Sequence, residues 1–576
     1  MHTGIANLPR AAQSSCGAPT RSEVTTKLAS MALEKLRWYH YDFWGLAVAI
    51  IFGAVSFTPS LLPREPALQG LIAGLTAVTG YVIGTAAHWL FRQFTSWQPA
   101  RRTQKFAWTI LIGLGVVAGV LMLTWGAIWQ RDLHISMGIP PPDHSTSPAI
   151  FIFTGTVFVA LVGIARLFRL LIRFTARLIR KLVPRRIARP ISLVLVSVLL
   201  YGAIDGILFR YIGESVNQTF SLADIGTDPG ASQPRTPARS GSSQSLISWD
   251  SLGRTGRNFV SAGPTQVQLT GFSGSIPADP IRAYAGLDSA ESTRERARLA
   301  VADLERAGGF ERSAIVVNTT TGTGWVNESS ASAVEYIFNG DIAQIGIQYS
   351  YLPSWISYLA DQEKAVAAGQ ELFEAVYEVW QELPAGSRPK LYVFGESLGS
   401  YGSEAAFSSL ADVTHRTDGA LWVGPPSFNA LHTRLVTERE PGTPQWRPIV
   451  DDGTTVRFIT SPADLDRPSG KWDHPRVIYL QHASDPIVWW SPDLLTRRPD
   501  WLAEQAADGV SEMTWIPGVT FWQITADLPF AIEVPDGYGH NYGAGLADMW
   551  VALVDPPNWS HADTARLRDA VAGLAR

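Results

Sequence analysis

Leu391-Tyr-Val-Phe-Gly-Glu-Ser-Leu-Gly-Ser400 is the stretch that predicts the fold of the C-terminal part of this chain. Its apolar run Tyr392–Phe394 consists of residues that favour β-strands. Ser397 follows between Gly395 and Gly399, and glycines at these positions let the backbone turn sharply and a helix approach the sheet. The pattern predicts a buried strand, a tight turn with an exposed serine, and a helix. An ordinary strand–turn–helix with an incidental serine is the competing interpretation.

The residues around this turn alternate between strand-like and helix-like segments from Leu246 onward. The expected strands are Ser313–Thr319, Ala343–Tyr349, the strand before Ser397, Ala420–Val423, Val456–Thr460 and Arg476–Gln481. The clearest expected helices are Thr293–Ala307 and Gln362–Glu382. This alternation predicts an α/β fold, a mostly parallel sheet with helices on both faces. In such folds the functional residues lie at the C-terminal ends of the strands.

A serine nucleophile requires a base that accepts its proton and an acid that orients the base. For the base we choose His540, which lies in the glycine-flanked loop 537–543. For the acid we choose Asp485, which directly follows the apolar strand that ends at Gln481. The order serine, aspartate, histidine along the chain is the order that this architecture uses.

Other residues compete for these two roles. Asp464 and Asp466 follow the preceding strand and are alternative acids. His482, His474 and His561 are alternative bases. Each of these residues, and each chosen one, also fits an ordinary place on the surface or in the core.

An oxyanion hole needs backbone N–H groups that are already in position. The N–H of Leu398 is one expected donor, and the loop Thr321, Gly322, Thr323 is expected to supply the other. This loop also fits a plain turn or a phosphate site, but no Walker lysine and no G-x-G-x-x-G that opens a helix accompany it. We find no sequence pattern for a metal ion and expect no cofactor.

Aromatic residues are concentrated near the predicted acid. They are expected to cap an apolar acyl pocket, to seat the domain on a bilayer, or to pack in the core. The residues are Trp489, Trp490, Trp501, Trp515 and Trp522, with Tyr351 and Trp355 after another strand.

The N-terminal part differs sharply in composition, because residues 43–212 contain five long apolar stretches. Each is close to the ~20 residues that a helix needs to cross a bilayer. The expected spans are Phe43–Leu62, Gly70–Phe91, Phe106–Ile128, Ala149–Leu170 and Ile191–Ile212. We therefore expect a cytoplasmic tail at 1–42, a transmembrane domain at 43–212 and a catalytic domain at 246–576.

Basic residues in the loops predict the orientation. The tail and the even-numbered loops hold most of them, at Arg10, Arg21, Lys27, Lys35, Arg37, Arg92, Arg101, Arg102, Lys105, Arg166, Arg169, Arg173, Arg177, Arg180, Lys181, Arg185, Arg186 and Arg189. The first loop carries only Arg64 and the third only Arg131. The positive-inside rule then places the N-terminus inside the cytoplasmic membrane and the catalytic domain on its outer side. The basic helix 166–180 is expected at the anionic lipid surface.

Two polar residues fall inside the expected spans, His88 in the second and Asp205 in the fifth. A carboxylate at mid-span costs ~2.5–3.5 kcal/mol on insertion scales, so it should face a partner or water. Asp205 is therefore expected either to belong to a functional polar cluster or to make a packing contact between helices.

Between the two parts, residues 213–245 are expected to be a linker. Its segment Gly226–Ser245 is rich in Gly, Pro and Ser and predicts flexibility. Cys16 is the only cysteine, so no disulfide is expected. The formal net charge of −4 gives no reason to expect nucleic acid as a partner.

The motifs SWDSLGRTGRNFVSAGPT (248–265), TTTGTGW (319–325), FGESLGS (394–400), SDP (484–486) and GYGHNYG (537–543) follow several N-terminal spans. In this combination the chain resembles a bacterial, largely actinobacterial, family of membrane-anchored α/β-hydrolases. The resemblance implies the α/β-hydrolase fold and puts Ser397 at the nucleophile position.

From these residues we expect a membrane-anchored serine hydrolase, esterase- or lipase-like, whose triad is Ser397, Asp485 and His540. The bilayer and an acyl ester, such as an envelope lipid, are the expected partners. Acyl transfer through the same acyl-enzyme and a non-catalytic role in lipid binding or transport are the alternatives.

Overall fold

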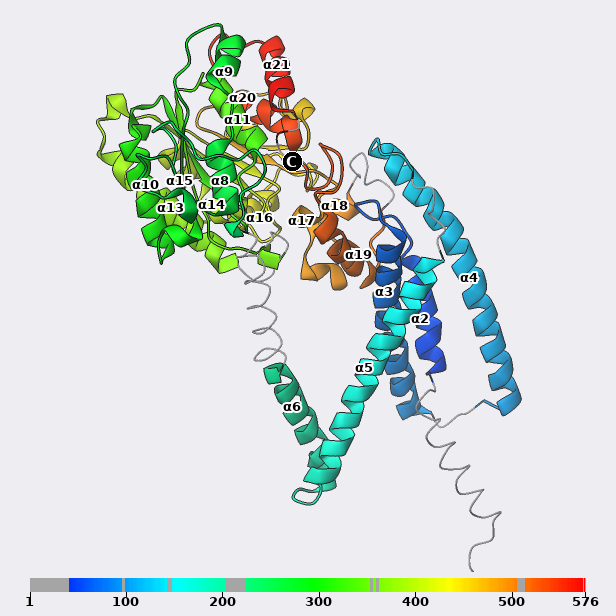
Figure 1. Ribbon diagram of the computed structural model, residues 1–576. Coiled ribbons are helices and arrows are strands. Elements are labelled where there is room, and N and C mark those ends of the chain that lie inside the picture. The colour runs from blue at the N-terminus through cyan, green and yellow to red at the C-terminus, as the bar shows by residue number, and fades with distance from the viewer. Residues whose placement is uncertain are drawn as a thin grey trace, which may run out of the picture.

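The computed structural model describes residues 41–95, 99–141, 148–203, 224–352, 356–358, 362–504, 513–572 and 574 (Figure 1). An α/β part contains the sheet, and a second part consists of long N-terminal helices. The short helices α17 (Pro486–Trp489), α18 (Asp500–Ala503) and α19 (Val519–Asp527) lie between the two parts.

The sheet consists of seven parallel strands in the order β1-β3-β2-β4-β5-β7-β6. Nearly every strand residue is buried, as expected for a parallel sheet that is covered on both faces. The strands are β1 (Ile281–Ala285), β2 (Ala314–Thr319), β3 (Ile342–Ile347), β4 (Lys390–Glu396), β5 (Gly419–Val423), β6 (Val456–Ile459) and β7 (Arg476–Leu480). The predicted α/β fold with a parallel sheet is confirmed.

Helices cover both faces of this sheet. The side chains of β2 alternate between the faces, because successive residues of a strand point in opposite directions. Ile315 and Val317 belong to the core beneath α10 (Thr293–Arg306) and α13 (Gln362–Glu382). Val316 belongs to the core beneath α11 (Glu328–Ile337), α20 (Leu546–Val554) and α21 (His561–Val571). The other helices of this part are α8 (Gly253–Ser261), α9 (Gln266–Ser273), α14 (Leu398–Glu404), α15 (Leu410–Arg416) and α16 (Ala430–Thr437).

The N-terminal part contains fewer long apolar helices than predicted. Its helices are α2 (Phe43–Val55), α3 (Pro66–Phe94), α4 (Arg101–Ser136), α5 (Ala149–Ile179) and α6 (Arg185–Ala203). Within the described residues three of them, α3, α4 and α5, are long and apolar enough to cross a membrane. Of the five expected spans, the second, third and fourth therefore correspond to helices that could cross a membrane. The fifth predicted stretch continues beyond residue 203 into residues that the structure does not describe.

The first predicted span is wrong for a local reason. Helix α2 has 13 residues, fewer than the ~20 that a crossing helix needs. Pro59 and Pro63 disfavour helical backbone in the residues before them, so the chain leaves the helix. Leu61 and Leu62 are instead fully buried against residues of the α/β part.

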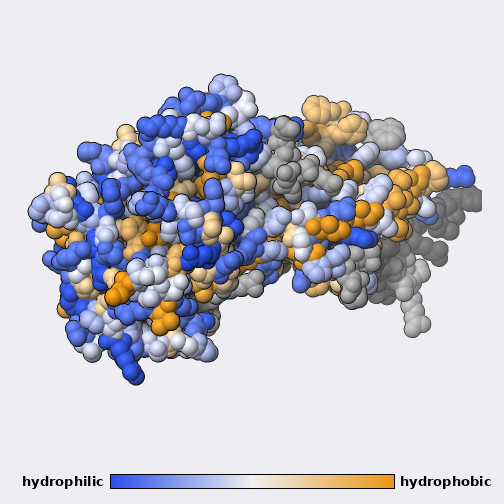
Figure 2. Space-filling model, turned by 90° about the horizontal axis from the view of Figure 1, so that it is seen from above, coloured by the Kyte–Doolittle hydropathy of each residue, from blue (hydrophilic) through white to orange (hydrophobic). Residues whose placement is uncertain are grey.

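Large apolar side chains are exposed mainly on the N-terminal helices. Val82, Trp89, Ile112, Val159 and Val194 are each 57 to 65 % exposed. Figure 2 shows hydrophobic residues gathered over this end of the molecule, whereas hydrophilic residues predominate over the α/β part. Contiguous apolar surface of this kind indicates contact with a membrane or another apolar partner.

Part of the predicted flexible linker is packed against the sheet. The Arg282 N–H donates to the Ala238 carbonyl (3.1 Å), and the Ser240 N–H donates to the Arg282 carbonyl (3.0 Å). The Ser240 hydroxyl also donates to buried Asp303 (2.5 Å). These bonds extend the edge of the sheet at β1 and give this end of the Gly226–Ser245 segment fixed contacts, contrary to the prediction.

The two parts of the molecule share a buried ion pair. Arg64, just before α3, donates from Nε to Asp527 at the end of α19 (2.9 Å), and both side chains are almost completely buried. The Ser60 hydroxyl donates to the same carboxylate (2.6 Å). Trp522 Nε1 donates to the Thr79 hydroxyl of α3 (3.1 Å).

A common hydrophobic cluster surrounds these polar contacts. Leu62 and Met137 from the helical part pack in it with Trp489, Trp501 and Ile524. Core packing is thus the structural role of these two tryptophans, while Trp355 lies outside the described residues.

Of the two polar residues predicted inside spans, the structure describes His88 but not Asp205. His88 of α3 makes a contact of 2.5 Å with Asp42, which caps the N-terminus of α2. A contact between two helices therefore explains His88. Asp205 lies outside the described residues.

Candidate active site

The sharp turn after β4 places Ser397 in an unusual backbone conformation. Its φ of 58° and ψ of −127° lie outside the regions that non-glycine residues normally adopt. The Ser397 N–H donates to the Val423 carbonyl of β5 (2.8 Å), and helix α14 begins at the next residue. Strained backbone held by the neighbouring strand is the geometry of a nucleophile elbow.

Glycines on either side of Ser397 are required by close backbone approach. A Cβ atom on Gly399 would lie 2.2 Å from the Thr319 carbonyl oxygen of β2. A Cβ atom on Gly395 would lie 2.3 Å from the Gly399 carbonyl oxygen. Any larger residue would push α14 away from the sheet and move Ser397.

His540 and Asp485 lie beside each other although 55 residues separate them in the sequence. His540 Nδ1 donates to Asp485 Oδ2 (2.6 Å). The same oxygen accepts a hydrogen bond from the Tyr542 hydroxyl (2.7 Å), and Asp485 Oδ1 accepts one from the Ile487 N–H (2.8 Å). Asp485 is fully buried, so three donors compensate the loss of water around its carboxylate.

The other ring nitrogen of His540, Nε2, is able to accept a proton. Because Nδ1 carries the proton donated to Asp485, Nε2 of the neutral ring is a proton acceptor. His540 Nε2 is buried and has no hydrogen-bond partner. Gly424 leaves room for the ring, since a Cβ atom there would lie 2.4 Å from His540 Cε1.

Ser397 and His540 both line a cavity of about 870 Å³, which is a typical size for a ligand site. One wall is the segment 528–535, and Ile139 from the N-terminal helical part contributes to another. Ser397 itself is 4 % exposed. Both side chains are therefore almost completely buried in the cavity wall.

Two carboxylates set the charge state of His540. Burial lowers the pKa of His540, but the attraction and hydrogen bond of Asp485 and the charge of Glu396 together hold this pKa above its usual value. Burial also raises the pKa of Glu396 to about 7, against the opposing effects of His540 and Asn327. The Glu396 carboxyl thus titrates near neutral pH in the same cavity as a histidine whose pKa is raised.

The alternative bases have other contacts. His482 Nδ1 donates to the Gly539 carbonyl (2.9 Å), and burial lowers the pKa of His482 to about 4. Its ring stacks on Tyr542, with 4.1 Å between ring centroids, so it supports the loop that carries His540. His474 lies 3.5 Å from Asp555, and His561 begins α21 on the surface.

The alternative acids are likewise engaged or exposed. Asp464 is paired with Arg447 (2.6 Å) and accepts the Thr460 N–H (3.0 Å). Asp466 is exposed. Neither lines the cavity that Ser397 and His540 share.

The predicted oxyanion donors lie at the same end of the sheet. Leu398 is the first residue of α14, where backbone N–H groups have no acceptor within the helix. Thr321 and Thr323 line the cavity. The Thr321 N–H, however, donates to the Trp325 carbonyl (3.1 Å), and Gly322 packs against Ser357. Thr323 is thus the residue of this loop that lines the cavity and remains a predicted donor.

Comparisons with known proteins agree with this geometry. A family model described as an alpha/beta-hydrolase family matches residues 281–567, and a model of that family's N-terminus matches residues 57–264. The chain belongs to this α/β-hydrolase family. No curated protein and no solved structure matches it.

Three residues of this α/β-hydrolase's cavity region were missed by sequence reasoning. Glu396 is part of the G-x-S-x-G motif, so its place beside the serine was a usable signal. Tyr542 lies two residues after His540, which was a weaker signal. Asn327 donates to Glu396 Oε2 (2.8 Å) from the N-terminus of α11, and the sequence contains no sign of that contact.

Within the described ranges of this hydrolase, no group of three or more His, Cys, Asp or Glu side chains is arranged to hold a metal ion.

Proposed function

We propose that this α/β-hydrolase is a serine ester hydrolase, esterase- or lipase-like, that cleaves acyl esters at the surface of a membrane. One observation carries the proposal. His540 is bonded through Nδ1 to buried Asp485 and presents an unpartnered Nε2 in the cavity that Ser397 lines. A positioned base in the same cavity as a strained serine fits acyl transfer through an acyl-enzyme.

In the proposed reaction, Ser397 Oγ attacks the ester carbonyl while its proton passes to His540 Nε2. Asp485 stabilises the imidazolium that forms, and the Leu398 N–H with the Thr323 N–H binds the negatively charged oxygen. The imidazolium then gives the proton to the departing alcohol oxygen. Water, deprotonated by His540, releases the acyl group as a carboxylic acid and restores the Ser397 hydroxyl.

The proposed location is a cytoplasmic membrane, with the N-terminus inside and the catalytic part outside. The apolar exposure of α3, α4 and α5 supports contact with a bilayer. The distribution of basic residues in the loops supports this orientation. An envelope lipid is the proposed class of acyl ester, since the catalytic part would lie beside its own substrate.

The test uses the full-length protein in detergent and short p-nitrophenyl esters. We expect Ser397→Ala to lower kcat by at least about 10³-fold, because the nucleophile is lost. A fluorophosphonate probe should label wild type at Ser397, as shown by peptide mapping. Ser387→Ala, at an exposed serine, is the matched control and should keep full activity. Equal rates for wild type and Ser397→Ala would refute the proposed nucleophile.

A further inference from the structure

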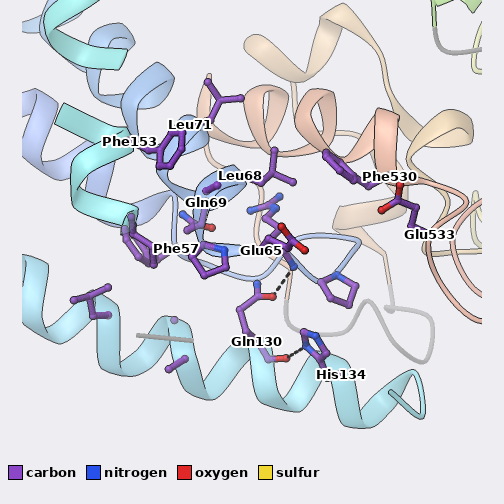
Figure 3. Close-up of a pocket in the computed structure, with 18 of the residues that line it drawn as sticks. Phe57, Glu65, Leu68, Gln69, Leu71, Gln130, His134, Phe153, Phe530 and Glu533 are labelled. Carbon is purple, nitrogen blue, oxygen red and sulfur yellow. Dashed lines mark hydrogen bonds between the residues drawn. The ribbon is translucent and has the colours of Figure 1, made fainter. Parts of the chain in front are cut away.

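A second cavity, shown in Figure 3, has a volume of about 1180 Å³ and adjoins the catalytic one. It is lined by residues of α3, α4 and α5, of the turn before α3, and of the segment 530–534. Three residues, Ile139, Glu533 and Val534, line both cavities. The two cavities therefore adjoin at this shared wall.

The lining of the second cavity changes in character from one end to the other. Figure 3 shows Phe57, Leu71 and Phe153 together at one end, where α3 and α5 meet. His134, Phe530 and Glu533 lie at the other end, so the polar groups there stand beside an aromatic ring, and Glu533 belongs to the shared wall. An occupant that fits both ends has an apolar tail and a polar group that faces the catalytic cavity.

A third, smaller cavity extends the apolar end. It has a volume of about 270 Å³, lies between α2, α3, α4 and α5, and shares Phe57 with the second cavity. Apolar and small side chains form nearly all of its lining. The three cavities thus form a series that leads from the helices long enough to cross a membrane to Ser397.

The charges on the walls select the polar group. Among the described residues that line the catalytic and the second cavity, Arg64 is the only lysine or arginine. Its Nε and Nη2 are paired with Asp527, while its Nη1 is buried without a hydrogen-bond partner. Glu65, Glu396 and Glu533 contribute carboxyl groups to the same walls. A phosphate would be repelled by these groups, whereas hydroxyl groups would find acceptors in them.

We infer that the second cavity binds the acyl chain of a lipid ester whose headgroup is uncharged and carries hydroxyl groups, and that the bilayer delivers this lipid to Ser397. The chain occupies the space between α3, α4 and α5, and the ester reaches Ser397 past the shared wall. This inference rests on the proposed ester hydrolysis for its catalytic consequence, but the binding step can be measured without it.

Binding is tested with full-length Ser397→Ala protein in vesicles that contain a diacylglycerol with a diazirine at the end of one acyl chain. We expect photolabelling of peptides from α3 and α4. Ala127→Trp fills the cavity from α4 and Thr156→Trp fills it from α5, so each should lower this labelling at least tenfold. Val120→Trp, at a residue of α4 that is 56 % exposed, is the matched control and should label as before. Labelling that neither cavity variant lowers would overturn the inference.

Catalysis supplies a second readout in the protein that retains Ser397. The ratio of long-chain to short-chain ester hydrolysis should fall at least tenfold in Ala127→Trp and Thr156→Trp, and remain unchanged in Val120→Trp. Diacylglycerol should be cleaved at least tenfold faster than phosphatidylglycerol with the same chains. Equal cleavage of both lipids would overturn the headgroup assignment.

The two proposals fail separately. Ser397-dependent hydrolysis with an unchanged chain-length ratio refutes the lipid cavity and leaves the hydrolase. Photolabelling that the cavity variants abolish, without any hydrolysis that depends on Ser397, refutes the hydrolase and leaves the lipid site.

Discussion

Glu396 is a buried carboxyl group inside the motif that carries the proposed nucleophile. It directly precedes Ser397, is 6 % exposed, and is held by a hydrogen bond of 2.8 Å from Asn327. Burial raises the pKa of its carboxyl to about 7, and its charge helps to raise the pKa of His540. The protonation of the proposed base is therefore coupled to a second buried group in the same cavity.

The pH profile of Glu396→Gln tests this coupling. His540 acts as a base only when Nε2 is unprotonated, so kcat/KM should rise with pH through the pKa of His540. The substitution removes a negative charge that favours the imidazolium, which lowers the pKa of His540. We expect the acidic limb of the profile to move to lower pH by several tenths of a unit or more.

The exposed carboxylate Glu382 supplies the control, because Glu382→Gln should leave the limb where it is in wild type. An acidic limb that stays in place or moves to higher pH in Glu396→Gln would show that Glu396 does not influence His540.

At the scale of elements, helix α14 is placed by contacts that only glycine permits. A Cβ atom on Gly402 would lie 2.3 Å from the Ala365 carbonyl oxygen of α13, and one on Gly369 would lie 2.0 Å from the Gly402 carbonyl oxygen. The backbones of α13 and α14 are thus in direct contact. This contact fixes the helix that begins directly after Ser397.

Substitution by alanine distinguishes this packing from ordinary helix propensity. In a helix interior Gly→Ala normally stabilises by about 0.5–1 kcal/mol, but overpacking costs about 1–3 kcal/mol. We expect Gly402→Ala to lower the Tm by several degrees. Gly271→Ala in α9, where a Cβ atom meets nothing within 4 Å, should keep or raise the Tm. Thermal unfolding monitored by tryptophan fluorescence measures both, and an unchanged Tm for Gly402→Ala would contradict the proposed contact.

The strands show what could be predicted from the sequence. Segments such as Ser313–Thr319 and Arg476–Gln481 are short apolar runs bounded by turn residues, and the structure places β2 and β7 there. Local pattern was sufficient because both faces of a parallel sheet are buried. Leu61 and Leu62 show the limit, since their apolarity fits a membrane span as well as the core in which they lie.

The candidate site shows a second limit. The order of Ser397, Asp485 and His540 along the chain could be read from the sequence, and so could the places of Ser397 after β4 and Asp485 after β7, whereas His540 follows helix α19. The hydrogen bonds from Asn327 to Glu396 and from Arg64 to Asp527 join residues 69 and 463 positions apart. Such contacts depend on how distant segments meet and leave no mark in local pattern.

At the scale of the whole molecule, the pair Arg64–Asp527 joins the helical and the α/β parts. Removing one member of a buried pair leaves an unpaired charge and costs about 3–5 kcal/mol. We therefore expect Arg64→Met to lower the Tm clearly and Asp527→Leu in the same protein to recover much of the loss. Arg294→Met breaks the exposed pair with Glu371 and should change the Tm little. A single variant as stable as wild type would mean that the pair does not hold the parts together.

The orientation in the membrane is a separate prediction for the whole molecule. The chain has a single cysteine, Cys16, in the predicted cytoplasmic tail. In intact cells a membrane-impermeant maleimide should not label Cys16 until the membrane is permeabilised. The same reagent should label Ser387→Cys, at an exposed position of the α/β part, in intact cells of a Cys16→Ser background. The reverse labelling pattern would place the catalytic part inside.

The hydrophobic cluster that contains Leu62 and Met137 together with Trp489 and Ile524 has a consequence for how this architecture can evolve. Because side chains from the helical part and the α/β part interlock in this cluster, neither part can be replaced without matching changes in the other. Grafting the catalytic half onto a foreign anchor would leave those tryptophan and isoleucine surfaces facing solvent, so we expect the halves to be inherited together.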